Sequence, residues 1–319
     1  MAAGGSGEFY KLLGTMIHCS EEDALSLVHG LNANEGSKDF FVPYFQRLPE
    51  IKIITEKGEV LHGNQSTKQA LTVSTEIGRG TFSLVYANSK PNTFTYKLIK
   101  KRRTDNTGMS YLYASFKEII IQLFLQSDKT MYSRSMSYGD FICKLQGIYR
   151  TSDEIILKME YLSESYGKSL RYHLVQSSIM APATPIEMDK IIKQDILNFI
   201  TLLKYFRDNY NFHHQDLKIE NVMVGEYSQM KLIDFGYESY IEIDGVKLGS
   251  IQRGRDDVYL FIDSLQELIG KKITPGFNAT LEALKSRGYD TLDEYITELK
   301  KAKGGSRKKT RRLRRKRRV

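Results

Sequence analysis

The chain has 319 residues, 41% of them hydrophobic and 27% charged, so it is long enough to bury an extensive core. No apolar run approaches the roughly 20 residues of a membrane-spanning helix, and we expect neither a signal peptide nor a membrane partner. The only two cysteines, Cys19 and Cys143, exclude a disulfide framework, and the six histidines form no His-x-x-x-His pair typical of zinc sites, so an intracellular protein is expected.

Residues 1–70 precede the first motif and match no pattern that indicates a function. A helix is predicted over residues 21–31, because Ser20 can cap its first turn. Its shared apolar face is expected to be Ala24, Leu25 and Val28. Alternation over residues 51–61 predicts a hairpin. This N-terminal extension is expected either to pack on the rest of the chain or to regulate it.

Two glycines, Gly78 and Gly80, lie between two β-like runs. Glycine lets the backbone approach phosphates closely, so these runs predict a hairpin lid over a nucleotide, although such a pair is also typical of a plain tight turn. The next strand is expected over residues 93–100. Because strand residues alternate between faces, only one of Lys97 and Lys100 can point inward, and we choose Lys97.

Two helices and an apolar strand follow. The first helix is predicted over residues 111–126, where Glu118 is either a buried partner for the lysine or a surface glutamate. Residues 154–162 read as a core strand. The second helix is predicted over residues 188–208, with one buried stripe at spacings of three and four: Ile192, Ile196, Phe199, Leu203 and Phe206.

Residues 213–236 are the most informative stretch of the chain and read His-His-Gln-Asp-Leu-Lys-Ile-Glu-Asn…Leu-Ile-Asp-Phe-Gly. Phosphoryl transfer asks a protein to position the nucleophile and to neutralise phosphate charge. Asp216 can accept a hydrogen bond from an attacking hydroxyl, and Lys218 can reach the transferring phosphate. Asn221 and Asp234 offer hard oxygen ligands suited to Mg²⁺.

These motifs resemble those of the eukaryotic-type protein kinases, whose catalytic loop reads His-Arg-Asp-x-x-x-x-Asn and whose metal-binding turn reads Asp-Phe-Gly. The resemblance covers about residues 75–270. It implies an α+β, two-lobed kinase-like fold with a shortened large lobe, ATP and Mg²⁺ as cofactors, and a protein substrate. The site residues that it implies are Asp216 and Lys218 for catalysis, Asn221 and Asp234 for the metal, and Ile77, Gly78, Gly80, Val85, Lys97, Glu118, Glu160 and Leu162 for ATP.

The resemblance also implies a division of the chain. A kinase-like domain is expected over residues 71–303, with a small lobe at 71–162 and a large lobe at 163–303. The extension of residues 1–70 precedes it, and a basic tail of residues 304–319 follows it.

The chain departs from the family pattern at several positions. Ser83 stands where the glycine loop has its third glycine. Gln215 replaces the arginine that binds a phosphate on the activation loop of these kinases, so we expect activity that does not depend on phosphorylation of residues 237–255. No Ala-Pro-Glu motif follows Asp234, and the segment from Asp234 to Asp257 is short. Asp257 is the expected anchor of the catalytic loop, and Asp256 is the alternative. A capping box at Thr291 predicts a last helix to about Lys303.

The net charge of +9 comes from the end of the chain, because residues 307–319 contain ten Lys or Arg and no acid. Such a block repels itself and is expected to be disordered until it meets a polyanion. Its target is open between an import receptor, nucleic acid bound through phosphates and an acidic partner, beside a merely solubilising role. Tails of this kind resemble those on proteins of large DNA viruses, which would place the protein in a host cell or virion; otherwise a cytoplasmic or nuclear location is expected.

Three functions compete. The first is a serine/threonine protein kinase, because Asp-x-Lys-x-x-Asn is the serine/threonine form of the catalytic loop. The second is a kinase-fold phosphotransferase for a small molecule, which the short segment after Asp234 favours. The third is a non-catalytic pseudokinase scaffold that acts through its basic tail. We prefer the first, since every chemical position is filled.

Overall fold

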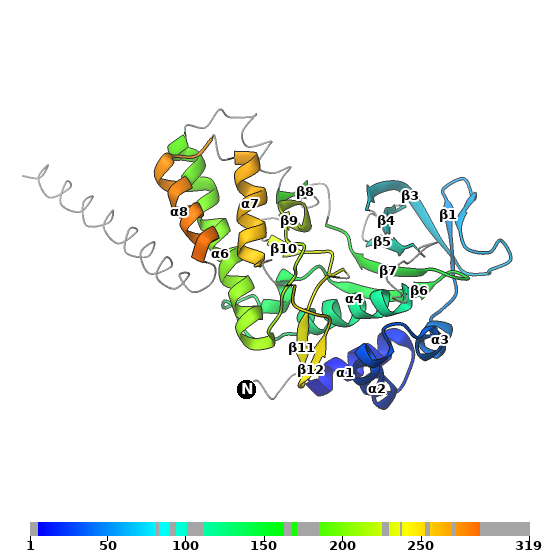
Figure 1. Cartoon of the computed structure of the whole chain (residues 1–319). Helices are drawn as coiled ribbons and strands as arrows, with labels where there is room; N and C mark the ends of the chain where they lie inside the picture. Colours follow the sequence, from blue (N-terminus) through cyan, green and yellow to red (C-terminus); the bar gives the residue numbers. More distant parts are fainter. Residues whose placement is uncertain are drawn as a thin grey trace, which may run out of the picture.

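The structure is a computed structural model in which an α+β fold is divided into two lobes (Figure 1). It describes residues 6–80, 83–89, 94–100, 111–162, 168–170, 185–224, 230–236, 238–252, 256–269 and 272–287. The helix expected from Thr291 and the basic tail lie outside these residues. Within the described ranges, no helix is both long and apolar enough to cross a bilayer.

One seven-stranded sheet builds the small lobe, in the strand order β2-β1-β3-β4-β5-β7-β6. Its strands are β1 (Lys52–Thr55), β2 (Val60–His62), β3 (Ala70–Arg79), β4 (Ser83–Asn88), β5 (Phe94–Ile99), β6 (Leu145–Arg150) and β7 (Ile155–Glu160). The antiparallel pair β1–β2 confirms the hairpin predicted over residues 51–61. Because β1 also pairs in parallel with β3, the sheet continues from the extension into the glycine-rich strand without a break.

The two faces of this sheet carry different side chains, because successive side chains along each strand point to opposite faces. One face holds a small core of its own, formed by Ile51, Ile53, Val73, Leu84, Tyr86, Tyr96, Leu98 and Ile156. On the other face, cross-strand register aligns Val85 with Lys97 and Lys97 with Leu157. The pairing therefore turns Lys97 away from the small core and toward the space between the lobes.

Helix α4 (Tyr111–Gln126) confirms the helix predicted at these residues. It contains neither glycine nor proline, and twelve of its sixteen residues are buried. Even Gln122 is buried, with its Nε2 donating to the carbonyl oxygen of Cys143 at 2.7 Å. A helix that is buried around its whole circumference needs cover on every side, and the sheet alone supplies only part of it.

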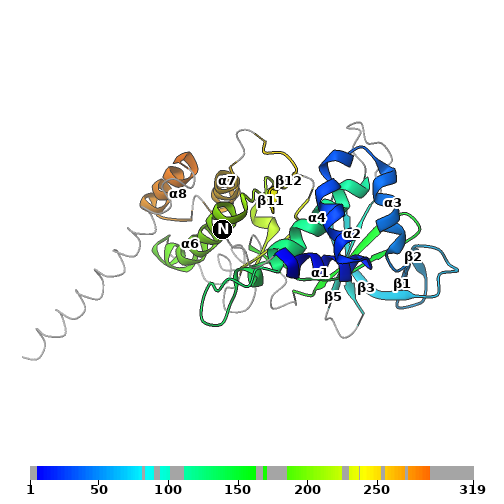
Figure 2. The ribbon, with the colours of Figure 1, turned by 90° about the horizontal axis from the view of Figure 1, so that it is seen from below.

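The extension provides the rest of that cover. Its helices α1 (Ser6–Ile17) and α3 (Lys38–Arg47) lie against α4, and α2 (Glu21–Gly30) packs on α1; these helices are the blue ribbons of Figure 2. Ring contacts join the two groups of helices: Phe9 meets Phe124 edge to face at 5.2 Å between centroids, and Phe41 stacks on Phe116 at 6.0 Å. The extension is thus built into the core of the small lobe.

Helix α2 begins as predicted, because the side chain of Ser20 accepts a hydrogen bond from the backbone N–H of Asp23. The predicted apolar face was wrong at Leu25, which is 39% exposed. The buried residues of α2 are Ala24, Leu27 and Val28. One residue corresponds to a rotation of about 100° around a helix, so Leu25 lies outside the stripe that positions 24, 27 and 28 share.

The large lobe is mainly helical, with α6 (Pro185–Tyr210), α7 (Asp257–Ile269) and α8 (Pro275–Arg287). Helix α6 begins three residues before the predicted start, because proline is well suited to the first helical position. The stripe residues Ile196, Phe199, Leu203 and Phe206 are buried, and the side chain of Ile192 lies outside the described ones. Short elements complete the lobe: β8 (Lys168–Ser169), β9 (Val222–Val224), β10 (Met230–Leu232), β11 (Ile241–Ile243) and β12 (Val246–Leu248).

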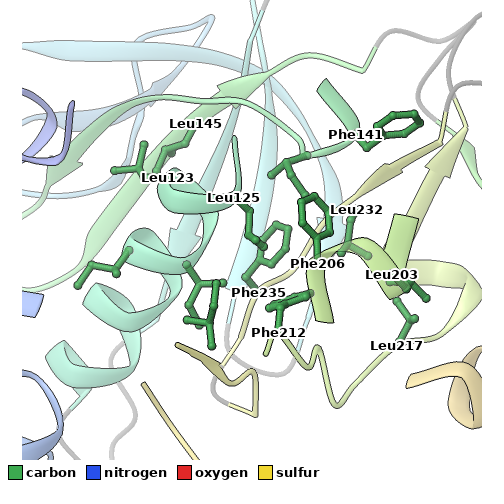
Figure 3. Packing of buried hydrophobic residues seen from close by; sticks show 14 of the residues in the cluster. Leu123, Leu125, Phe141, Leu145, Leu203, Phe206, Phe212, Leu217, Leu232 and Phe235 are labelled. Atoms are coloured by element: carbon green, nitrogen blue, oxygen red, sulfur yellow. The ribbon is translucent and has the colours of Figure 1, made fainter. Parts of the chain in front are cut away.

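A single hydrophobic core runs from the extension through α4 into the large lobe. Figure 3 shows its middle, where side chains of α4, α6 and the loops between the lobes converge. Phe206, Phe212 and Phe235 meet there, with ring centroids 6.2 Å apart in both the Phe206–Phe212 and the Phe212–Phe235 pairs. The loops that carry the candidate site therefore rest on packed aromatic side chains.

The two leucines of α2 provide a test of the extension as part of the core. We expect Leu27→Ala to lower the free energy of unfolding by about 3 kcal/mol, because it removes fully buried methyl groups. The matched control Leu25→Ala should change it by no more than about 0.5 kcal/mol. Urea unfolding of both variants measures the difference. Equal effects would contradict the packing of α2 described here.

Candidate active site

A lysine lies between carboxylates of both lobes at the centre of the molecule. The Nζ of Lys97 on β5 is 2.5 Å from Glu118 Oε1 of α4 and 2.7 Å from Asp234 Oδ1 of the large lobe. Burial disfavours the charged form of Lys97, but the two carboxylates outweigh it and raise the lysine pKa. Lys97 therefore stays a cation, and it holds the sheet, α4 and the large lobe in a fixed relation.

Of the two lysines weighed from the sequence, the structure turns Lys97 inward. Lys97 is buried within β5, whereas Lys100 follows the end of that strand and is only half-buried. Glu118 is likewise buried, which excludes the alternative of a surface glutamate.

Asp234 lies in a tight turn directly after β10. Its φ is +64°, a left-handed conformation that aspartate tolerates better than most residues. The next residue, Phe235, is fully buried beside Phe212 and His214, while the Asp234 side chain stays 45% exposed. Lys97 holds the pKa of Asp234 below its usual range, so this carboxylate faces the space between the lobes in its charged form.

The catalytic-loop residues singled out from the sequence lie together on the large-lobe side. Lys218 Nζ is 2.9 Å from Asp216 Oδ2. The amide nitrogen of Asn221 donates to the Asp216 carbonyl oxygen at 2.9 Å and approaches its Oδ2 at 3.3 Å. Partial burial works against the charge of Lys218, but the hydrogen bond and charge of Asp216 raise the pKa of this lysine.

Backbone hydrogen bonds join this loop to the turn of Asp234. The N–H of Ile233 donates to the carbonyl oxygen of Asn221 at 3.1 Å, and the carbonyl oxygen of Ile233 lies 3.0 Å from His214 Nε2. From the opposite side, the buried carboxylate of Asp257 accepts from the N–H groups of His214 and Gln215, each at 2.7 Å. Asp256 instead accepts from the N–H of Val258 in the first turn of α7, so Asp257 is the anchor of the loop.

The remaining sequence-predicted residues lie along β3, β4 and β7. Gly78 pairs with Val85 across the hairpin, and a side chain at Gly78 would meet Val85 at 3.5 Å. Ile77 is 51% exposed, and Leu162 follows the end of β7. Gly80 closes the turn by donating its N–H to the carbonyl oxygen of Ser83 at 2.9 Å.

Glu160 has a structural task that the sequence did not reveal. Its Oε1 accepts from the N–H of Lys144 at 2.7 Å and lies 2.5 Å from Nζ of Lys231 on β10. Glu160 is the last residue of β7, so this ion pair joins the end of the small-lobe sheet to the large lobe.

The donor set suits a divalent magnesium ion. Asp234 offers a charged carboxylate, and the amide group of Asn221 uses its nitrogen for Asp216, which leaves Oδ1 as a ligand oxygen. Both are hard oxygen ligands, the kind that Mg²⁺ prefers. Asp234 and Asn221 thus fit the metal, and Lys97 beside them fits a phosphate.

The comparison with protein families agrees with this geometry. The model of the protein kinase domain matches residues 71–248, more than half of the 319 residues. The chain belongs to the protein kinase domain family. The matched part runs from the glycine-rich strand β3 to the end of β12, so it contains every site residue predicted for catalysis, metal and ATP, whereas the loop anchor Asp257 lies beyond it.

Individual kinases resemble this domain at low identity. The calmodulin-binding receptor-like cytoplasmic kinase 1 of Arabidopsis thaliana is 26% identical over 53% of this chain and 32% of its own length. The cyclin-dependent kinase 1 of Encephalitozoon cuniculi is 24% identical over 50% of this chain and 48% of its own. The mitosis inhibitor protein kinase mik1 of Schizosaccharomyces pombe is 25% identical over 68% of this chain and 37% of its own. The chain therefore spans about a third to a half of the length of these relatives.

Among solved structures, the crystal structure of a kinase domain matches with a TM-score of 0.38 and 20% identity. The match covers 52% of this chain and 50% of the other.

In the sequence, Gln215 stands out only because it replaces an arginine of the family pattern. The structure shows what its side chain binds. It is fully buried, and its Nε2 donates to the carbonyl oxygens of Glu238 at 2.6 Å and Ser250 at 2.8 Å. Its Oε1 accepts from the N–H of Gln252 at 2.5 Å. A neutral amide thus binds both ends of the segment that follows Asp234.

Lys117, next to Glu118 on α4, is a second buried cation of the kinase domain. It is 2% exposed, and burial lowers its pKa from 10.5 to about 8, although the carboxylates of Glu35 and Glu238 offset part of this effect. The folded protein therefore binds this proton less tightly than the unfolded chain does.

This lysine makes the stability depend on pH. Between about pH 8 and 10.5 the unfolded chain carries more protons at residue 117, so the free energy of unfolding should rise with pH in this window. In Lys117→Met that rise should be smaller by at most about 3 kcal/mol. Urea unfolding of both proteins at several pH values measures the difference. The contributions of the other ionisable groups cancel, because both proteins contain them. Parallel stability curves would show that Lys117 titrates normally.

Proposed function

We propose that this chain is an ATP-dependent protein kinase that transfers the γ-phosphate of ATP to serine or threonine hydroxyls. The observation that carries the proposal is the meeting of two groups of residues between the lobes. Lys97, paired with Glu118, comes from the small lobe, and Asp234, Asn221 and Asp216 come from adjoining loops of the large lobe. Phosphoryl transfer needs this combination of a phosphate-binding cation, metal ligands and a base.

The small lobe and the turn of Asp234 would bind the nucleotide. Mg²⁺ and ATP, when bound, supply the transferable phosphoryl group and neutralise much of its charge. Asp234 and Asn221 would hold the metal, and Lys97 would bind the phosphates beside it. Ile77, Gly78, Gly80 and Val85 would cover the nucleotide from the β3–β4 hairpin, and the backbone of Glu160 and Leu162 would bind the base.

The catalytic loop would act on the acceptor. Asp216 would orient the attacking hydroxyl and accept its proton, because its carboxylate is half exposed and held in place from two sides. Lys218 would neutralise the charge that develops on the transferring group, and its raised pKa favours the cationic form.

The preference for serine and threonine rests on Lys218 within Asp-x-Lys-x-x-Asn, which is the serine/threonine form of the loop. The names of two matching relatives, a cyclin-dependent kinase and a mitosis inhibitor protein kinase, agree with a protein substrate. The basic tail of residues 304–319 would then direct the kinase to an import receptor, a nucleic acid or an acidic partner.

Asp216→Asn tests the chemistry. The substitution keeps the size of the side chain but removes the base, so we expect phosphoryl transfer to fall by about 10²- to 10⁴-fold while ATP binding is retained. The measurement is incorporation of label from γ-labelled ATP with Mg²⁺ into a mixed protein pool, with phosphoamino-acid analysis. Asp153→Asn, a substitution in the turn between β6 and β7, is the control and should be fully active.

The other outcomes separate the competing functions. Equal activity of Asp216→Asn and wild type would overturn the assignment of the base. ATP binding without labelled protein would favour a small-molecule acceptor, and the loss of both would favour a scaffold.

A second test concerns the segment that Gln215 holds. Because its amide already binds Glu238, Ser250 and Gln252, we expect protein freed of phosphate by a phosphatase to retain full activity. Gln215→Ala should lower the activity at least about tenfold, since it leaves buried backbone groups unpaired. Mass spectrometry confirms that residues 237–255 carry no phosphate. Activity that disappears with the phosphatase and returns on phosphorylation of this segment would refute the proposal.

A further inference from the structure

Three elements of the fold meet beside Lys117 of α4. They are α4 itself, the β11–β12 hairpin and the extension, which lie side by side in Figures 1 and 2. Between them is a polar cavity of about 210 Å³, lined by residues of all three: Asn32, Glu35, Tyr113, Lys117, Glu238, Gly249, Ser250 and Gln252. Contacts around this cavity therefore connect the extension both to α4 and to the hairpin, in addition to the ring contacts between the extension and α4.

Asn32 connects all three elements. It lies in the 3₁₀ turn η1 (Asn32–Asn34) between α2 and α3. Its Oδ1 accepts from the hydroxyl of Tyr113 on α4 at 3.2 Å and from the N–H of Gly249, just after β12, at 3.4 Å. Its Nδ2 donates to the carbonyl oxygen of Lys247 in β12. One amide group from the extension thus binds α4 and the hairpin at once.

Direct packing makes the connection tight. Gly249 has a φ of +87°, and a side chain there would lie 2.5 Å from Nζ of Lys117 and 2.7 Å from the carbonyl oxygen of Ser239. The positive φ and the carbonyl oxygen of Ser239 favour glycine at this position, and the ammonium group of Lys117 from α4 lies directly against it. A further bond from the extension, between the hydroxyl of Tyr10 and Asp244 Oδ2 at 3.0 Å, holds the turn of the same hairpin.

Both elements that Asn32 joins are connected to the site, because α4 carries Glu118 and Gln215 binds residues on either side of the hairpin. The position of α4 decides whether Glu118 reaches Lys97, and the segment from Asp234 to the hairpin is bound by Gln215 of the catalytic loop. We propose that Asn32 is a positioning residue and that the N-terminal extension acts as a built-in activator, which holds α4 and the β11–β12 hairpin in the arrangement that catalysis needs. This inference rests on the proposed kinase activity, but the coupling of α4 to the hairpin through Asn32 is a property of the fold.

The chain contains a matched control for this role. Asn34 lies in the same 3₁₀ turn, but its Nδ2 donates to the carbonyl oxygen of Gly30 at 2.8 Å, within the extension. Asn34→Ala should therefore remove a local bond only, whereas Asn32→Ala removes the bonds to α4 and to the hairpin. Both variants lose the same side chain at nearly the same place, so a general destabilisation of the turn affects them alike.

The first measurement needs no catalytic activity. Hydrogen exchange followed by mass spectrometry should show faster exchange in α4 and in residues 241–249 for Asn32→Ala, and no change there for Asn34→Ala. Tyr113→Phe, which removes only the hydroxyl on the α4 side, should speed exchange at residues 246–249 in the wild-type background but not in the Asn32→Ala background. Unchanged exchange in Asn32→Ala, or equal effects of both asparagine variants, would overturn the proposal.

The second measurement concerns the reaction. Asn32→Ala should lower kcat at least about fivefold with a smaller change in the KM for ATP, and Asn34→Ala should match the wild type. Thermal unfolding midpoints of the two variants, compared in the same assay, show whether a lower kcat reflects lost folding. A wild-type protein without phosphoryl transfer would count against the proposed function, while the exchange experiment would still decide on the coupling. Full kcat in Asn32→Ala with altered exchange would refute the activating role.

Discussion

The ammonium group of Lys97 is shared by carboxylates from the two lobes, and the rest of the structure serves to keep these three groups together. A buried charge is costly unless its partners are in place, and the cost of leaving one partner out is several kcal/mol. Glu118 reaches the lysine only if α4 lies against the sheet, and Asp234 reaches it only if the loops of the large lobe approach. Closure of the lobes and burial of this charge are therefore one event.

Helix α4 needs cover from outside the family-matched region, because that region shares one hydrophobic core with the extension. The match begins at residue 71, inside the sheet, whereas Phe9, Phe41 and Tyr44 of the extension pack on α4. Without them, Phe116 would lose its ring contacts and the outer face of α4 would meet water. The sheet also joins the extension to the family-matched region, because its strands are paired without interruption from β2 to β6.

The sequence predicted those parts whose determinants are close together in the chain. The catalytic loop and the turn of Asp234 are recognisable because their residues lie within about twenty positions of each other, and the β1–β2 hairpin follows from local alternation. The alternation of side chains in a strand allowed only one of Lys97 and Lys100 to point inward, and the apolar run that follows Lys97 favoured that residue. Helix α4 was located correctly from its apolar run, although its burial on all sides was not recognised as a sign of a second partner.

Long-range contacts account for what the sequence did not reveal. Nothing in the pattern of residues 52–55 distinguishes a strand that pairs in parallel with β3 from an isolated hairpin. Leu25 was placed on the apolar face of α2 because the local pattern does not show which face of this helix packs on α1. Asn32 looks like an ordinary polar residue of a turn, and only the fold shows that it meets Tyr113 and Gly249.

The bonds between the extension and the hairpin have a consequence for how the protein is made. Tyr10 and Asp244 are 234 positions apart, and Asn32 and Lys247 are 215 apart. The helices of the extension must therefore wait for more than 200 further residues before these partners emerge from the ribosome. Loop closure over such separations is slow, and apolar faces stay exposed in the meantime. We expect the nascent chain to depend on chaperones, and catalytic competence to arise only when synthesis has passed the hairpin.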